Sequence, residues 1–171
     1  MRLSTRKVSL SELTLFSMFG AIMFLSRFVL QAAPNIHLLA TFIAAYTLSY
    51  RAKALIPIYV YVLLEGVASG FSLWWYPYLY IWLPLWGAFM LICYFEPPRK
   101  VRVALYMVTC ALHGLSFGIM YAPAQAFISG LSYEGMLAWV MAGLPFDIAH
   151  AIGNFFLASL ITPLHALLRR L

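Results

Sequence analysis

Charged residues are scarce in this chain. Only 9% of its 171 residues are Asp, Glu, Lys or Arg, whereas 64% are hydrophobic and the mean hydropathy is +0.90. Because a water-soluble domain usually carries about 25% charged residues, this composition excludes one. The length allows roughly six or seven membrane spans of about 20 residues with short links. We predict an all-α integral membrane protein with a single domain over residues 1–171.

Cysteines and known catalytic motifs are also scarce or absent. Cys93 and Cys110 are the only cysteines, and without CxxC spacing they predict neither a disulfide scaffold nor a zinc site. The sequence lacks HExxH, a P-loop, a GxSG-like turn and adjacent glutamates, which argues against metalloproteases, ATPases and intramembrane proteases. We therefore expect no catalysis, no metal site and no cofactor. The first apolar run is too long for a cleavable signal peptide, so we expect it to be retained.

Apolar runs separated by turn and charge signals predict six membrane-spanning helices. Their approximate ranges are residues 10–32, 36–50, 54–70, 78–95, 102–122 and 144–168. Pro123 is expected to break the fifth helix, and Pro145 is expected in the first turn of the sixth. Residues 123–143 are ambiguous, because Ser129-Gly130 and Glu134-Gly135 are turn signals within an otherwise apolar stretch.

The distribution of basic residues predicts the orientation. Ten of the eleven Lys and Arg residues lie before span one, between spans two and three, between spans four and five, or after span six. These alternate connections share one side, and the positive-inside rule places them and both termini in the cytoplasm. The net charge of +6 then reflects membrane orientation, and no nucleic acid is expected as a partner. We predict a multi-pass protein of a prokaryotic plasma membrane, embedded in its lipid bilayer.

Two of the five acidic residues, Glu65 and Asp147, lie inside apolar spans. An ionisable side chain within a span is costly and normally faces the protein interior, a ligand or a water-filled cavity. His150 and Asn154 follow Asp147 at positions that share one stripe of a helix, which favours a ligand-binding role. Glu65 could instead pair with Arg27, the basic residue within the first span, or with a histidine.

The remaining unusual side chains fall in the half of the bundle distant from the basic clusters. At a rise of about 1.5 Å per residue, Glu65 and His113 lie just beyond the midplane, and Asn154, His150 and Asp147 lie progressively further out. Other polar and aromatic residues border the outer links, namely Asn35, His37, Trp74, Trp75 and Tyr78. A proton or ion pathway would need polar residues throughout the depth, so this pattern favours a pocket open to the outside.

The pocket interpretation has alternatives at several positions. Trp and Tyr residues near an interface commonly form an aromatic belt, and His113 could be a hydrogen-bonded contact between helices. Taken together, acid, histidine and aromatic side chains suit a small, polar heteroaromatic molecule, cationic forms included.

Three stretches resemble a known family. They are residues 13–21 (LTLFSMFGA), 34–37 (PNIH) and 145–154 (PFDIAHAIGN), and they are similar to the substrate-binding S component of an energy-coupling factor (ECF) vitamin transporter. The resemblance implies six helices, cytoplasmic termini and an outward-facing pocket built from the last three spans and the outer loops. It also implies docking on a membrane coupling subunit driven by two ATPase subunits. In place of the family's Ala-x-x-x-Ala pattern on span one, this chain has Ser17-x-x-x-Ala21, with Gly20 beside it.

The resulting hypothesis is an S component that captures a small water-soluble vitamin or precursor, such as a thiamine precursor or a vitamin B6 form. The candidate substrate-binding residues are Asn35, His37, Glu65, Trp74, Trp75, Tyr78, His113, Asp147, His150 and Asn154. The candidate partner-docking residues are Ser17, Gly20 and Ala21. The alternatives are a stand-alone secondary transporter or channel, and a membrane scaffold in which the polar residues only pair helices.

Overall fold

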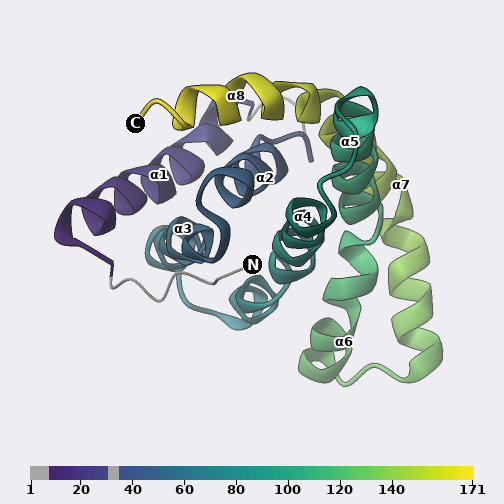
Figure 1. Cartoon of the computed structure of the whole chain (residues 1–171). Coiled ribbons are helices and arrows are strands. Elements are labelled where there is room, and N and C mark those ends of the chain that lie inside the picture. The colour runs from purple at the N-terminus through teal and green to yellow at the C-terminus, as the bar shows by residue number, and fades with distance from the viewer. Residues whose placement is uncertain (1–7, 31–34) are drawn as a thin grey trace.

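The computed structural model describes residues 8–30 and 35–171, and within these ranges it contains helices and turns but no strand (Figure 1). The helices are α1 (Leu10–Val29), α2 (Leu39–Tyr50), α3 (Leu55–Ser69), α4 (Leu83–Phe95), α5 (Arg99–Leu115), α6 (Phe117–Ser129), α7 (Tyr133–Leu157) and α8 (Ile161–Leu168). Short 3₁₀ helices lie between some of them: η1 (Arg51–Ala54), η2 (Leu73–Leu79) and η3 (Ala158–Leu160). The prediction of an all-helical fold is confirmed.

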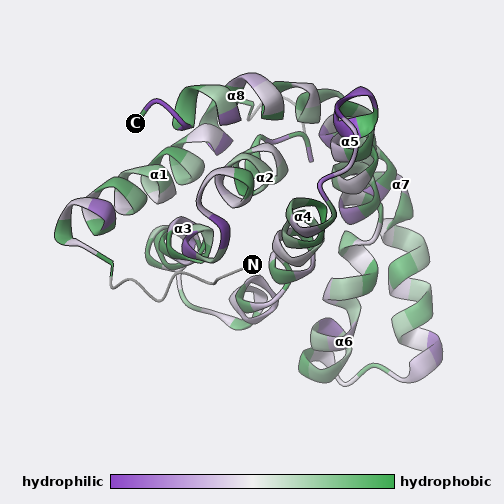
Figure 2. Cartoon of the chain, in the orientation of Figure 1, coloured by the Kyte–Doolittle hydropathy of each residue, from purple (hydrophilic) through white to green (hydrophobic). Residues whose placement is uncertain are grey.

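The outer surface of the helices is apolar. Figure 2 shows hydrophobic residues along most of the helix exteriors, and single side chains such as Phe127 are up to 90% exposed. Five helical segments of the described chain are long and apolar enough to cross a membrane, namely Leu10–Val29, Leu39–Ser69, Leu73–Phe95, Arg99–Ser129 and Tyr133–Leu168. Extensive exposed apolar surface on helices is typical of lipid contact. The chain is therefore a multi-pass membrane protein.

Side-chain contacts fix the relative directions of α1, α2 and α3. Near the start of α1, Lys53 of η1 binds the Glu12 carboxylate at 2.5 Å, and near its end Arg27 pairs with Glu65 of α3. Helices α1 and α3 therefore run in the same direction. Because α2 lies between them in sequence, it returns the chain to the end where α1 began, and the backbone turns back at Arg51, whose φ is positive at 58°.

The later helices alternate in direction in the same way. On α2, Thr41 donates to the Leu157 carbonyl at 3.1 Å, and the Ser49 hydroxyl lies 2.7 Å from Nδ1 of His165, so α2 and the α7–α8 segment run in parallel. Helices α4 and α5 are antiparallel, as are α5 and α7. Helix α2 is the most enclosed helix, buried along most of its length between α1, α4 and α8.

Both proline predictions are wrong. Helix α6 continues through Pro123 to Ser129, and α7 begins at Tyr133, well before Pro145. A proline removes one backbone hydrogen bond, but helices within membranes tolerate this where neighbouring elements pack against them, and α7 packs along both α5 and α6. The chain bends instead at Ser116, between α5 and α6.

Other boundaries shift by a few residues. The fourth helix begins at Leu83 rather than near residue 78, because the aromatic residues before it form η2. Helix α5 begins at Arg99, directly after Pro98, and the break expected around Pro34 lies outside the described residues. Residues 123–143 form the end of a helical hairpin. Gly130 closes α6 in a left-handed conformation with φ of 64°, which confirms the Ser129-Gly130 turn signal.

The α6–α7 hairpin extends away from the other helices (Figure 1). Its two arms belong to segments of 31 and 36 residues, Arg99–Ser129 and Tyr133–Leu168. At about 1.5 Å per residue these segments exceed the hydrocarbon core of about 30 Å. Tyr80 and Tyr121 attach the hairpin to the rest of the bundle, because Tyr80 donates to the Met120 carbonyl and Tyr121 to the Trp74 carbonyl.

Gly20 permits a close approach between α1 and α3. A Cβ atom at this position would lie 2.9 Å from the Pro57 carbonyl oxygen and nearer still to the Val60 side chain. The candidate docking residue Gly20 is thus buried within the chain, whereas its neighbours Ser17 and Ala21 are half-buried. The close helix contact at this stripe is intramolecular.

Gly20→Ala should therefore destabilise the protein. Overpacking a tight interface typically costs about 1–3 kcal/mol, so we expect a lower Tm in detergent. Gly87→Ala on α4 is the matched control, since a Cβ there meets nothing within 4 Å and alanine favours a helix. Equal Tm values for the two variants would contradict the close α1–α3 contact.

Candidate functional site

Five buried or half-buried rings form one connected group, which we call the histidine cluster: His37, Trp82, His113, Phe117 and His150. The rings of His37 and His150 lie 4.6 Å apart, and Phe117 lies 5.2 Å from His150. Trp82 stacks on His113 at 5.8 Å. The cluster draws on the segment before α2, the residues between η2 and α4, and helices α5, α6 and α7, so only the folded bundle assembles it.

Glycine and asparagine bring α5 and α7 together beneath the cluster. A Cβ at Gly114 would lie 2.9 Å from both the Ala151 nitrogen and Nδ2 of Asn154, so α5 can approach α7 only because this residue has no side chain. Nδ2 of Asn154 donates to the Cys110 carbonyl at 3.2 Å. This close contact sets the distance between His113 and His150.

Several polar atoms of this region make no hydrogen bond with any described residue. They are Nδ1 of His37, Nε1 of Trp82, Nδ1 of His113, Nε2 of His150 and Oδ1 of Asn154. Native proteins satisfy the large majority of buried polar groups, and each one left unpaired costs about 1–3 kcal/mol. A concentration of such atoms around aromatic faces is typical of a site that binds a polar molecule.

The tautomer of one histidine follows from its partner. Nε2 of His113 lies 2.9 Å from the Ile81 carbonyl oxygen, which can only accept a hydrogen bond, so Nε2 carries the proton. In neutral His113, Nδ1 is then an acceptor. Burial lowers the pKa of His37 to about 4, with a further contribution from nearby His113, so His37 is neutral at pH 7.

Asp147 is not directed at an open pocket. Both of its carboxylate oxygens accept from the backbone N–H of Gly118, at 3.1 and 3.2 Å, in the first turn of α6. The carboxylate thus caps a helix that begins inside the protein, where backbone donors lack partners. A Cβ at Gly118 would collide with this carboxylate. The Asp147 side chain itself is buried, at 7% exposure.

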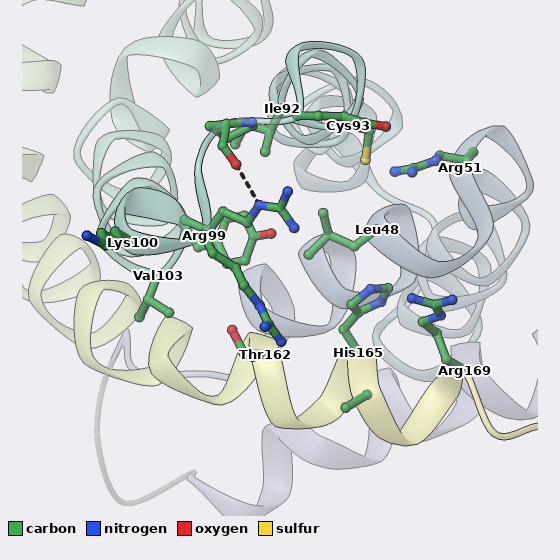
Figure 3. A pocket seen from close by; sticks show the side chains of 15 residues that line it. Leu48, Arg51, Ile92, Cys93, Arg99, Lys100, Val103, Thr162, His165 and Arg169 are labelled. Carbon is green, nitrogen blue, oxygen red and sulfur yellow. Dashed lines mark hydrogen bonds between the residues drawn. The ribbon is translucent and has the colours of Figure 1, made fainter. Parts of the chain in front are cut away.

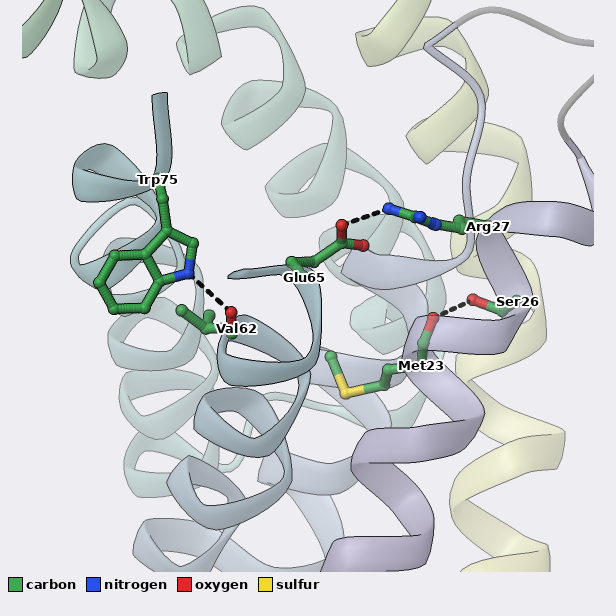
Figure 4. Close-up of polar contacts among 6 residues, drawn as sticks. All are labelled: Met23, Ser26, Arg27, Val62, Glu65 and Trp75. Atoms are coloured by element: carbon green, nitrogen blue, oxygen red, sulfur yellow. Dashed lines mark hydrogen bonds and ion pairs between the residues drawn. The ribbon is translucent and has the colours of Figure 1, made fainter. Parts of the chain in front are cut away.

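Glu65 pairs with Arg27, which was one of the two alternatives drawn from the sequence. Figure 4 shows the Glu65 carboxylate directed at the Arg27 guanidinium. The Tyr61 side chain lies close to Glu65, and its ring lies 6.0 Å from Trp82. Tyr61 therefore lies between Glu65 and the histidine cluster.

The aromatic candidates divide into two groups. Trp74, Tyr78 and Trp82 form a ladder with ring distances of 5.4 and 5.7 Å, which leads from the surface to the cluster. Trp75 instead donates from Nε1 to the Val62 carbonyl at 2.8 Å, on the side of α3 opposite Arg27 (Figure 4). Asn35 is exposed, with φ of 59°, and serves the turn before α2.

The sequence interpretation missed Trp82, Phe117 and Gly118. Two of them carried a usable signal, because Trp82 follows Trp74 and Tyr78 at intervals of four residues and Phe117 lies four residues after His113. Gly118 gave no comparable signal, since nothing in one sequence shows that α6 begins beside it.

A cavity of about 960 Å³ lies at the opposite end of the bundle, where α2 and α4 end and α5 begins. None of the ten predicted substrate-binding residues lines it. Within the described chain, no group of three or more His, Cys, Asp or Glu residues could hold a metal ion.

Fold and site define the class of this protein as an all-helical, multi-pass membrane protein with a buried histidine and aromatic cluster. A comparison with protein-family models, curated protein sequences and solved structures finds no match.

Asp147→Ala should destabilise the protein in the absence of any ligand, because the buried Gly118 N–H loses its acceptor. We expect a loss of about 1–3 kcal/mol, measured by unfolding in detergent. Asp147→Asn keeps an acceptor oxygen and should lose less. If both variants unfold like the wild type, Asp147 does not cap α6.

Arg27 and Glu65 should be energetically coupled. Arg27→Met leaves the buried Glu65 carboxylate without its partner, and Glu65→Gln removes the charge that Arg27 neutralises. A double-mutant cycle should give a coupling of about 1 kcal/mol, a modest value because the Arg27 side chain is 33% exposed. Strictly additive effects on unfolding would exclude the pair as a stabilising contact.

Proposed function

We propose that the chain is a membrane-embedded substrate-capture protein, the S component of an ECF-type importer, and that the histidine cluster binds its substrate. The unpaired polar atoms of His37, Trp82, His113, His150 and Asn154 are the observation that carries this proposal. Small-molecule sites are mostly apolar, with a few polar groups that fix orientation, and the cluster has this composition.

The chemistry of these atoms restricts the substrate. Nε1 of Trp82 can only donate, Oδ1 of Asn154 can only accept, and Nδ1 of neutral His113 accepts. A matching substrate offers at least one acceptor and at least two donor hydrogens on a body thin enough to lie between aromatic rings. An amino-substituted nitrogen heterocycle meets these requirements, which supports a thiamine precursor over a substrate with acceptors alone.

The substrate is proposed to bind as a neutral ring. Glu65 is paired with Arg27 and Asp147 with the Gly118 N–H, so both buried acids already have partners within the chain. The sequence alone also allowed a cationic substrate, because it left both buried acids available to bind one. The internal partners of Glu65 and Asp147 remove the main support for that possibility.

The alternating helix directions support six crossings. If α2 and α3 are counted as separate spans, the first helix begins and the last helix ends on the same side as the turns that contain Arg51, Arg99 and Lys100. The positive-inside rule then places this basic side in the cytoplasm and the histidine cluster toward the outside. In this arrangement a membrane coupling subunit with two ATPase subunits would drive release inward.

The scaffold alternative draws on the internal pairing of Glu65 and Asp147, which shows that polar residues also join helices in this bundle. It does not account for the five unpaired atoms, since a polar residue that only joins helices has its partner within the chain.

Binding can be tested on the purified full chain. Mass spectrometry of protein expressed in rich medium should identify a copurified heterocycle, and aminopyrimidines and pyridines should raise its Tm. His150→Phe and Asn154→Leu should each weaken binding by about 5-fold to 150-fold, the equivalent of one buried hydrogen bond.

His165→Phe is the matched control, because it makes the same chemical change in α8 at the other end of the bundle. The substrate proposal is wrong if no compound of the panel shifts the Tm, or if His165→Phe weakens binding as much as His150→Phe. Uptake by cells without a coupling subunit or ATPases would instead favour a stand-alone transporter.

A further inference from the structure

The charged residues that line the cavity at the basic end of the bundle are mostly positive. Its volume is about 960 Å³, and the charged residues that line it are Arg51, Glu96, Arg99, Lys100, Arg102 and Arg169. Five of these six are cationic. They come from segments far apart in the sequence, namely the turn after α2, the start of α5 and the end of α8. In Figure 3, Arg51 and Arg169 lie on one side of Leu48, and Arg99 and Lys100 lie on the other.

None of these cations forms an ion pair within the described part of the chain. Its two ion pairs, Arg27 with Glu65 and Lys53 with Glu12, both lie outside the cavity lining. Arg102 is held in place by its Nε, which donates to the Pro97 carbonyl at 2.7 Å and leaves the two terminal nitrogens for other acceptors. A concentration of positive charge in a concave site attracts an anion.

The backbone at the cavity also adopts uncommon conformations. Three non-glycine residues of the described ranges have positive φ, and two of them, Arg51 at 58° and Glu96 at 45°, line this cavity. Nε1 of Trp86 donates to the Arg51 carbonyl at 3.3 Å and so restrains this turn. Sparsely populated backbone conformations persist where the surroundings hold them, and they concentrate at functional sites.

Most of the other lining residues are apolar, Thr162 and His165 being the exceptions, and the lining continues to the exposed apolar surface. Leu48, Ile92 and Tyr106 contribute apolar surface, and Val103 both lines the cavity and is 41% exposed. A soluble anion gains nothing from such a surface, whereas a lipid places its phosphate among cations and its chains against apolar side chains. The positive-inside rule assigns this basic side to the cytoplasm, and the cytoplasmic leaflet is the one that carries anionic headgroups.

We propose that this cavity binds the phosphate of an anionic phospholipid, with the arginines around the headgroup and an acyl chain leaving past Val103. The site is independent of the substrate proposed for the histidine cluster, because the two sites share no residue. Arginine suits the role, since its planar fork of N–H donors binds phosphate oxygens in pairs.

The test uses the full chain, stripped of lipid in an uncharged detergent, and follows Tm during titration. Dioctanoyl phosphatidylglycerol should raise the Tm saturably, whereas dioctanoyl phosphatidylcholine and glycerol 3-phosphate should not. Arg102→Gln and Arg169→Gln should each weaken phosphatidylglycerol binding about fivefold. Arg170→Gln is the control, since it removes the same charge one residue away from the cavity lining.

Each other outcome overturns the proposal in a distinct way. An equal response to phosphatidylcholine would mean that the headgroup charge is not recognised, and an equal response to glycerol 3-phosphate would make the ligand a soluble phosphate. An equal loss in Arg170→Gln would reduce the effect to general surface charge. The Arg102 side chain donates to the Pro97 carbonyl, so Arg102→Gln could fail to fold. In that case Arg169→Gln decides the question, because the Arg169 side chain makes no hydrogen bond with a described residue and its loss should not affect folding.

Discussion

The carboxylate of Asp147 holds together the part of the molecule on which the candidate site depends. By accepting from the Gly118 N–H, it allows α6 to begin inside the protein directly after the bend at Ser116. That bend places Phe117 in contact with both His113 and His150. A continuous helix would keep Phe117 near His113, four residues earlier, but it would change the position of Phe117 relative to His150 on α7. A buried charge is normally unfavourable in an apolar bundle, but here it accepts from a backbone N–H at the start of a helix, where donors lack partners within the helix.

The two ends of the bundle differ in whether their charged groups have partners within the chain. At the end with the histidine cluster, the charges are paired internally and the unpaired atoms belong to neutral groups, since both Glu65 and Asp147 have partners. At the basic end, cations gather around a cavity with a single acid, Glu96. Neutral donors and acceptors select a ligand by shape and hydrogen-bond pattern, whereas a group of cations selects mainly by charge. The fold thus separates the two proposed binding sites at opposite ends of the bundle.

Composition and hydropathy predicted the all-helical membrane class and most helix positions, because a span in lipid must be both apolar and helical. The same reasoning failed at Pro123 and Pro145, where packing between helices outweighs one lost backbone hydrogen bond. For the site, the stripe of His150 and Asn154 could be recognised from spacing alone. The pairing of Asp147 with Gly118 could not be predicted, since it depends on the bend at Ser116, for which the sequence contains no signal. His37 and His150 meet only because the chain at the start of α2 lies against α7, where Thr41 donates to the Leu157 carbonyl.

The length of the segments that form the α6–α7 hairpin makes the protein sensitive to the thickness of its membrane. Its arms, α6 and the first part of α7, belong to helical segments of 31 and 36 residues that carry exposed apolar side chains such as Phe127. At about 1.5 Å per residue, segments of this length exceed a hydrocarbon core of about 30 Å. A membrane responds to such an excess by local thickening, or the hairpin responds by leaning, and either adjustment has an energetic cost for each ångström of mismatch. Phe117 and His150 lie at the base of these arms. A change in the tilt of the hairpin would therefore shift these two rings within the histidine cluster. The hydrophobic thickness of the host membrane thereby becomes a variable that acts on the site from a distance.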